Sequence, residues 1–463
     1  MSLADRTDQE IARREEEARR LDADDPLPTL RSEFLVPPAP GGRYPEAAYF
    51  AGNSLGLQPR SVAGVLREEL DDWARLAVEG HTQARRPWVD YHELLREPAA
   101  RLVGARPHEV VAMNSLTVNL HLMMASFYRP AGRRTRIVIE DSAFPSDSYA
   151  VASQAVQHGL DPAETVVRLR PRPGEDILRT EDVVGFLERE GGTVALLLLG
   201  GVNYLTGQLM DMAEITRAGR AAGAAVGWDL AHAAGNVPLR LHDWDVDFAA
   251  WCTYKYLNAG PGAVAGCFVH ERHVRDASLP RLAGWWGTEP SVRFRMDPEI
   301  APPPSADAWQ LSNPPILALA PVLASLEIFD RVGMDALRAR SERLTGYLAA
   351  RLARVPGAEV ITPADPAARG SQLSLRVADA GGLVRDLAAA HGVIADAREP
   401  DVVRLAPVPL YCTFHDCHRA AEALADLTGD RAQRTRSGGA EAGPGPSGSG
   451  VSVPANARDG VGS

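Results

Sequence analysis

From about Ser61 onwards the chain alternates helical segments with short apolar segments, and this alternation restricts the possible fold more than any other feature. Short apolar runs that recur between helices are typical of an α/β unit whose strands form a mainly parallel sheet. Strands are predicted at 136–139, 193–199, 225–228, 248–252 and 264–269, and the helices between them include 117–128, 148–158 and 212–222. The sequence therefore predicts an α/β fold.

A chain of 463 residues is too long for one small core, so we expect more than one packed unit. The large unit is predicted at 61–334 and contains a long helix that starts near Ile316. A smaller α+β domain is predicted at 335–432. We assign residues 1–60, with a charged helical stretch at 8–22 and a connecting arm, to the small domain. The Gly-, Ser- and Pro-rich segment 433–463 is predicted to be disordered.

Composition excludes several classes of partner. The net charge of −11 argues against nucleic acid or an anionic membrane surface. The chain has no run of about 18 apolar residues, so no membrane span is expected. Four cysteines give no disulfide framework for this length, and we expect a cytoplasmic protein. Cys412 and Cys417 lie beside His415 and His418, but their spacing matches no common zinc pattern, so no metal is expected.

Lys255 is the only lysine among 49 basic residues. Arginine can replace lysine as a surface cation, but its guanidinium stays protonated and cannot form a Schiff base. Lys255 follows one predicted strand and Asp229 follows the preceding one. Ligands of parallel sheets bind at that edge. A lysine amine with a carboxylate beside it suggests pyridoxal phosphate, whose pyridine nitrogen needs an acidic partner. Chance retention of one lysine and a helix N-cap role for Asp229 are the alternatives.

Other segments supply groups that such a cofactor needs. Thr117 opens a predicted helix, where backbone N–H groups and its hydroxyl could hold a phosphate. Phe144 could stack on the pyridine ring, with Asp147 near it. Arg404 stands in an apolar run, where a buried cation needs a partner. Either a substrate carboxylate or a structural ion pair would satisfy Arg404.

These segments resemble those of the kynureninase family, which are pyridoxal-phosphate enzymes with the aspartate-aminotransferase fold. The resemblance extends from about Tyr49 to Leu427. Its most specific segments are 49–57, 144–147, 229–232 with 235–236, 254–258, 312–315 and 404–411. It implies a large cofactor-binding domain with a mainly parallel seven-stranded sheet, a smaller α+β domain, and a homodimer with its active sites at the subunit interface.

The resemblance also implies a role for each matching residue. Lys255 would carry the cofactor, and Tyr254 would be a second catalytic residue that donates a proton. Trp285 and Asn313 would reach the cofactor phosphate from the partner subunit. The other implied cofactor-binding residues are Leu116, Thr117, Phe144, Pro145, Ser146, Asp147, Asp229 and His232, and the substrate-binding residues are Arg404, His81, Ser54 and Asn313. Gly200 departs from the family, which often has a hydroxyl residue there, so a phosphate contact at this position is in doubt.

The implied reaction is hydrolytic cleavage of L-kynurenine, or of its 3-hydroxy form, to an anthranilate and L-alanine. His81 and Asn313 could hydrogen-bond an aryl hydroxyl, which points towards the 3-hydroxy substrate. The alternatives are an aminotransferase, a cysteine desulfurase that uses Cys412 or Cys417, and a non-catalytic homologue.

Overall fold

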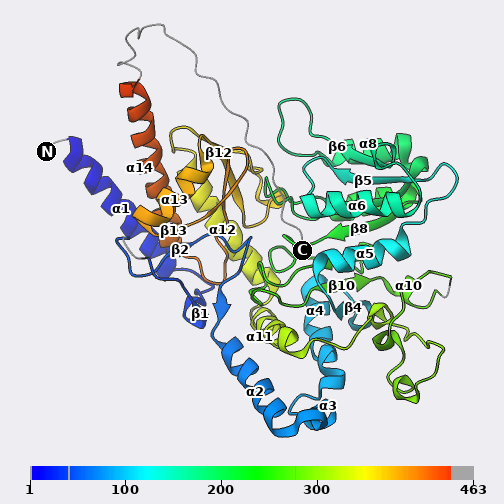
Figure 1. Cartoon of the computed structure of the whole chain (residues 1–463). Coiled ribbons are helices and arrows are strands. Elements are labelled where there is room, and N and C mark those ends of the chain that lie inside the picture. The colour runs from blue at the N-terminus through cyan, green and yellow to red at the C-terminus, as the bar shows by residue number, and fades with distance from the viewer. Residues whose placement is uncertain (1–2, 40–41, 277, 439–463) are drawn as a thin grey trace, which may run out of the picture.

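The structure is a computed structural model that describes residues 3–39, 42–276 and 278–438 (Figure 1). Its centre is a seven-stranded sheet in the order β4-β10-β9-β8-β7-β5-β6. Only β10 runs antiparallel to its neighbours. The strands are β4 (Val110–Ala112), β5 (Arg136–Glu140), β6 (Val166–Leu169), β7 (Val194–Gly200), β8 (Ala225–Asp229), β9 (Phe248–Trp251) and β10 (Gly266–Val269). This sheet confirms the predicted α/β fold.

Both faces of this sheet are buried. In β7, Leu197 and Leu199 belong to one hydrophobic core, whereas Leu196 and Leu198 belong to the other. Strands covered on both faces read as continuous apolar runs, and this is why the sequence pattern revealed them. The covering helices include α2 (Ser61–Leu76), α4 (Arg96–Val103), α5 (Leu116–Phe127), α6 (Pro145–Gln157), α8 (Thr180–Glu190), α9 (Met212–Ala221) and α11 (Ile316–Val332).

A second, antiparallel sheet has the order β11-β12-β15-β14 and its own hydrophobic core. Its strands are β11 (Ala358–Val360), β12 (Leu373–Val377), β14 (Asp396–Arg398) and β15 (Val402–Leu405). The helices α12 (Met334–Leu352), α13 (Ala380–His391) and α14 (Phe414–Gly438) pack with it. Gly333, at φ 82°, separates α11 from α12, because glycine adopts this backbone region without strain.

The N-terminal segment packs against the region of the second sheet. Helix α1 (Leu3–Ala23) lies beside α14 in Figure 1, and Ala18 is fully buried in the core of that region. Further along, β2 (Ala48–Tyr49) pairs in parallel with β13 (Val393–Ile394). On either side of β2 in the chain, β1 (Phe34–Leu35) and β3 (Gln58–Pro59) pair to form a separate two-stranded antiparallel ribbon.

Some sequence expectations differ from the structure. Disorder was predicted from residue 433, but α14 continues to Gly438. The remaining residues of that segment, 439–463, lie outside the described part. Strands β4 and β6 were not predicted, since β4 has only three residues and the residues of β6 are half-buried or exposed. Within the described residues, every helix is too short or too polar to cross a bilayer.

Candidate active site

A cavity of about 280 Å³ lies at the carboxyl ends of the central strands. Gly200, Asp229 and Glu140 end β7, β8 and β5 and line one side of it. Arg398 and Arg404, from the second sheet, line another side. The cavity is therefore built from both sheets, at the edge where ligands of parallel sheets bind.

Lys255 lies in this cavity, on the turn that follows β9. Its Nζ is 3.1 Å from His232 Nε2 and 5.8 Å from the centre of the Phe144 ring. Burial, followed by the charge of Lys255, lowers the pKa of His232 well below its usual value, so this imidazole is neutral. Within the described part of the chain, His232 Nδ1 has no hydrogen-bond partner. Tyr254 also lines the cavity, and burial raises its pKa to about 12.

Buried carboxyl groups form one wall. Burial raises the pKa of Asp229, although the Ala231 N–H donates to Asp229 Oδ1 at 2.6 Å. Burial and the charge of Asp229 raise the pKa of Asp147 still more strongly. The two carboxyl groups interact directly, and Asp147 is the one that more strongly favours its protonated form. Burial also raises the pKa of Glu140 to about 7. We call Glu140, Asp147 and Asp229 the carboxylate wall.

Two helices begin at the cavity, α5 at Leu116 and α6 at Pro145. Proline suits the first position of α6 because that residue needs no N–H partner. At the start of α5, the side chain of the N-cap residue Ser115 makes no capping hydrogen bond, so it leaves the first N–H groups of the helix for other acceptors. Thr117 Oγ1 and Ser146 Oγ are 2.7 Å apart and join the two helix starts. Such N–H groups and hydroxyls suit an anion such as a phosphate.

Phe144, the residue before α6, has a side chain placed for stacking. Its residue is 43% exposed, and its ring stands edge-on to that of Tyr204 at 5.1 Å between centroids. The ring thus stays partly exposed in the cavity, with Lys255 Nζ over it.

Arg404 forms the opposite wall with Arg398. The Arg404 side chain is only 1% exposed, and its Nε donates to Asp396 Oδ1 at 2.7 Å. Its Nη2 donates to Asp396 Oδ2, and its Nη1 donates to the Tyr204 carbonyl at 2.7 Å. The structural ion pair, one of the two alternatives from the sequence, is therefore present, and Arg404 lines the cavity as well.

The structure brings most of the predicted residues together. Lining the cavity are Ser54, Leu116, Thr117, Phe144, Ser146, Asp147, Asp229, His232, Tyr254, Lys255 and Arg404. Pro145 does not line it but begins α6. Trp285 lies instead on a separate pocket of about 750 Å³, and Asn313 is exposed. His81 is exposed on α3 (Gly80–Gln83), beyond α2 in Figure 1, and its ring contacts Trp88.

Some lining residues were missed from the sequence. Asn53, Glu140, Tyr204 and Arg398 contribute to the cavity. Asn53 directly precedes Ser54. Glu140 directly follows the predicted strand 136–139, so the reasoning from strand ends that identified Asp229 could also have identified Glu140. Arg398 and Tyr204 carry no comparable signal. Gly200 lies beside Asp229 in the sheet register, and its N–H lies 3.2 Å from Glu140 Oε1. Gly200 therefore lies directly beside the carboxylate wall.

The cysteines and histidines near the C-terminus do not converge. Cys412 Sγ contacts the Tyr49 carbonyl, whereas Cys417 Sγ contacts the Leu344 carbonyl. His415 Nε2 is 3.1 Å from Glu15 Oε1. Burial raises the pKa of both thiols, and both residues are fully buried.

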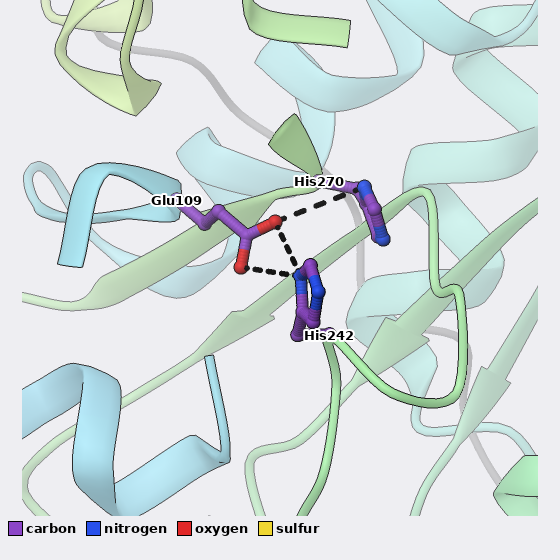
Figure 2. Close-up of side chains that lie close together, drawn as sticks. All are labelled: Glu109, His242 and His270. Atoms are coloured by element: carbon purple, nitrogen blue, oxygen red, sulfur yellow. Dashed lines mark hydrogen bonds and ion pairs between the residues drawn. The ribbon is translucent and has the colours of Figure 1, made fainter. Parts of the chain in front are cut away.

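One other group of potential metal ligands occurs in the described residues, Glu109 with His242 and His270 (Figure 2). Hydrogen bonds of Glu109 explain why these three residues lie close together. Glu109 accepts the N–H groups of Arg106 and Glu271 and lies 3.0 Å from His242 Nδ1. The potential ligand atoms are up to 4.8 Å apart, whereas tetrahedral zinc with bonds of about 2.0–2.1 Å needs roughly 3.4 Å. We interpret this cluster as structural.

The groups around the main cavity fit pyridoxal phosphate. The Lys255 amine can join its aldehyde, and the carboxyl groups of Asp147 and Asp229 can face its ring nitrogen. The two helix starts offer N–H and hydroxyl donors for its phosphate. The unpartnered His232 Nδ1 leaves one more polar atom for a ligand.

Comparison with known proteins gives close relatives over most of the chain. The sequence is 67% identical to the kynureninase of Salinispora tropica, over 90% of this chain and 98% of the relative. It is 57% identical to the kynureninase of Koribacter versatilis, over 86% and 94%, and 57% identical to that of Myxococcus xanthus, over 88% and 96%. The family model for the kynureninase C-terminal domain matches residues 337–424.

Solved structures share the fold at lower identity. Apo cysteine desulfurase from Thermococcus onnurineus NA1 has a TM-score of 0.69 at 16% identity, over 83% of this chain and 95% of that chain. The cystine C-S lyase C-DES, in complex with cysteine persulfide, has a TM-score of 0.70 at 18% identity, over 82% and 97%. These likenesses confirm the expected fold class and carry no further argument.

Proposed function

The chain belongs to the kynureninase family, and we propose that it hydrolyses L-kynurenine, or its 3-hydroxy form, to an anthranilate and L-alanine. We propose pyridoxal phosphate as the cofactor. The observation that carries the proposal is the position of Lys255, the only lysine, between a wall of carboxyl groups and a wall of arginines. An amino acid carries a carboxylate for the arginines and an amine for the cofactor.

In this proposal Lys255 holds the cofactor covalently and Asp229 faces the pyridine nitrogen, with Asp147 as the proton donor to Asp229. The Leu116 N–H and the hydroxyls of Thr117 and Ser146 hold the phosphate. Phe144 and Pro145 shape the ring face, and His232 lies beside Lys255. When bound, the cofactor supplies an electron sink for the substrate α-carbon.

The protein groups then move protons and hold the substrate. Lys255, once replaced by the substrate amine, takes the α-proton. Tyr254 keeps its proton at neutral pH because burial raises its pKa to about 12. When water adds to the γ-carbonyl and the bond between the β- and γ-carbons breaks, Tyr254 can give that proton to the β-carbon of the alanine product. Arg404 holds the α-carboxylate, while Ser54 lies towards the aryl group.

We also propose a homodimer in the cytoplasm. Trp285, Asn313 and His81 are exposed and lie away from the cavity of their own chain. Their contribution to cofactor or substrate binding therefore requires the partner subunit. The four described cysteines are free and buried, which fits a reducing compartment.

Other reactions fit the site less well. A cysteine desulfurase needs a reactive cysteine that reaches the substrate, but Cys412 and Cys417 are fully buried and their thiol pKa values are raised. An aminotransferase would convert kynurenine and a 2-oxo acid to a keto acid. A non-catalytic homologue would have no need for a lone lysine beside a carboxyl pair. Product analysis separates these reactions.

Substitution of Lys255 by Arg tests the proposal. The variant keeps the charge but cannot form the covalent link, so kynurenine cleavage should fall at least about a thousandfold. Borohydride reduction and peptide mass analysis of the wild type should find the cofactor on Lys255, and the variant should show no cofactor adduct. Cleavage by Lys255→Arg at a rate comparable to the wild type would falsify the proposed mechanism.

A further inference from the structure

Arg398 is the last residue of β14 and lines the cavity with Arg404 of the neighbouring β15. Asp396 lies opposite Arg404 in the antiparallel register, so β14 carries both the carboxylate that binds Arg404 and a second cation. The Arg398 side chain is 32% exposed, whereas that of Arg404 is 1% exposed. Of the two guanidinium groups, that of Arg398 is the more accessible.

The hydrogen bonds of the two arginines differ. The protein uses each nitrogen of Arg404, since Nε and Nη2 donate to Asp396 and Nη1 donates to the Tyr204 carbonyl. Arg398 donates from Nη1 to the carbonyl of Ala397, and its Nη2 is 3.2 Å from Asp396 Oδ2. A guanidinium has five N–H donors, so Arg398 retains more of them for a ligand.

The charges at this wall do not balance. Asp396 is one carboxylate shared by two guanidinium groups. Arg404, the neighbouring cation, repels the Arg398 guanidinium. Burial and the charge of Arg404 lower the pKa of Arg398, so an anion placed between the arginines would relieve an unfavourable arrangement. In the carboxylate wall, Glu140 and Asp229 end strands of the other sheet and Asp147 lies on α6, and the charge of Lys255 acts on Asp147 and Asp229.

We propose that Arg398 is a second binding residue for the α-carboxylate of the amino-acid substrate, acting together with Arg404 and held in place by Asp396. The inference rests on the proposed function and adds a residue to the substrate site. Asp396 holds the buried Arg404 side chain in a fixed position. Arg398 supplies coplanar N–H groups, from which a carboxylate can accept two hydrogen bonds in bidentate geometry.

The test compares two ligands that differ only at the carboxylate. L-alanine and L-alaninamide are titrated into the holoenzyme, and the absorbance of the lysine-bound cofactor gives each dissociation constant. The dissociation constant of L-alaninamide divided by that of L-alanine measures how much affinity the carboxylate contributes. In Arg398→Gln this ratio should fall about ten- to a hundredfold, the range expected for hydrogen bonds to a charged group.

Arg376→Gln is the matched control, because Arg376 lies on β12 of the same sheet with a side chain 38% exposed and pairs with Asp176 outside the cavity. Its ratio should equal that of the wild type. A ratio within twofold of the wild type in Arg398→Gln would overturn the inference. If that variant does not fold, Arg398→Met, which keeps the apolar part of the side chain, is tested in its place, with the same ratio and the same expected fall. A wild type that shows no lysine-bound cofactor would instead overturn the proposed function.

Discussion

At the scale of single residues, Glu140 is the most unusual group in the cavity. Its carboxyl group is almost completely buried and accepts the N–H of Gly200. Burial, opposed only partly by backbone N–H groups, raises its pKa from 4.5 to about 7. Between pH 4.5 and about 7, the folded protein therefore holds a proton on Glu140 that the unfolded chain has already released.

Replacement of Glu140 by Gln should make stability less dependent on pH. In the wild type, the raised pKa stabilises the fold fully below pH 4.5, and this contribution is lost as the pH rises towards about 7. The difference between 4.5 and about 7 corresponds to about 3 kcal/mol. Urea unfolding of the cofactor-free proteins should thus show that Glu140→Gln gains stability relative to the wild type between pH 4.5 and pH 8. If the unfolding free energies of the two proteins depended equally on pH, the raised pKa of Glu140 would be contradicted.

The sequence predicted those site residues whose position follows from a strand end or a helix start. Asp229 ends a strand that is apolar on both faces, and Thr117 opens a helix, so both stood out. Arg398 ends a three-residue strand without an apolar run. Its place beside Arg404 depends on pairing between strands, which no local pattern encodes.

At the scale of elements, the starts of α5 and α6 are the parts of the fold that most directly prepare the site. They converge on the cavity, and the hydroxyls of Thr117 and Ser146 contact each other there. The central strands were predictable because they are buried on both faces. Short or partly exposed strands such as β4 and β6 were not, since their residues show no comparable run.

Thr117→Val should weaken cofactor binding about tenfold, because it removes a hydroxyl that can donate to the phosphate while it keeps the side-chain volume. The dissociation constant of pyridoxal phosphate, measured by absorbance on the cofactor-free protein, tests this. The control is Thr82→Val on the exposed helix α3, where binding should not change. Unchanged affinity in Thr117→Val would show that its hydroxyl does not reach the phosphate.

At the scale of the whole molecule, a buried ion pair ties the N-terminal segment to the second sheet. Asp25 Oδ2 is 2.8 Å from Arg340 Nε on α12, and both side chains are only 1% exposed. Arg340 also donates to the carbonyl of Pro409, in the segment that follows β15. The N-terminal segment thus supports the strand that carries Arg404.

Asp25→Ala should destabilise the protein by about 3–5 kcal/mol, because it leaves the buried Arg340 without its carboxylate. The unfolding free energy from urea denaturation measures this change. Asp24→Ala alters an exposed neighbour in the same segment and should change stability by less than about 0.5 kcal/mol. Similar effects of the two substitutions would mean that the buried pair contributes little.

The solitary amine of Lys255 has a practical consequence. Protein produced with isotope-enriched lysine carries its label in the cavity alone, so a magnetic-resonance spectrum of the intact protein reports on one nitrogen without assignment. The chain thereby contains its own probe for following each ligand that enters the cavity.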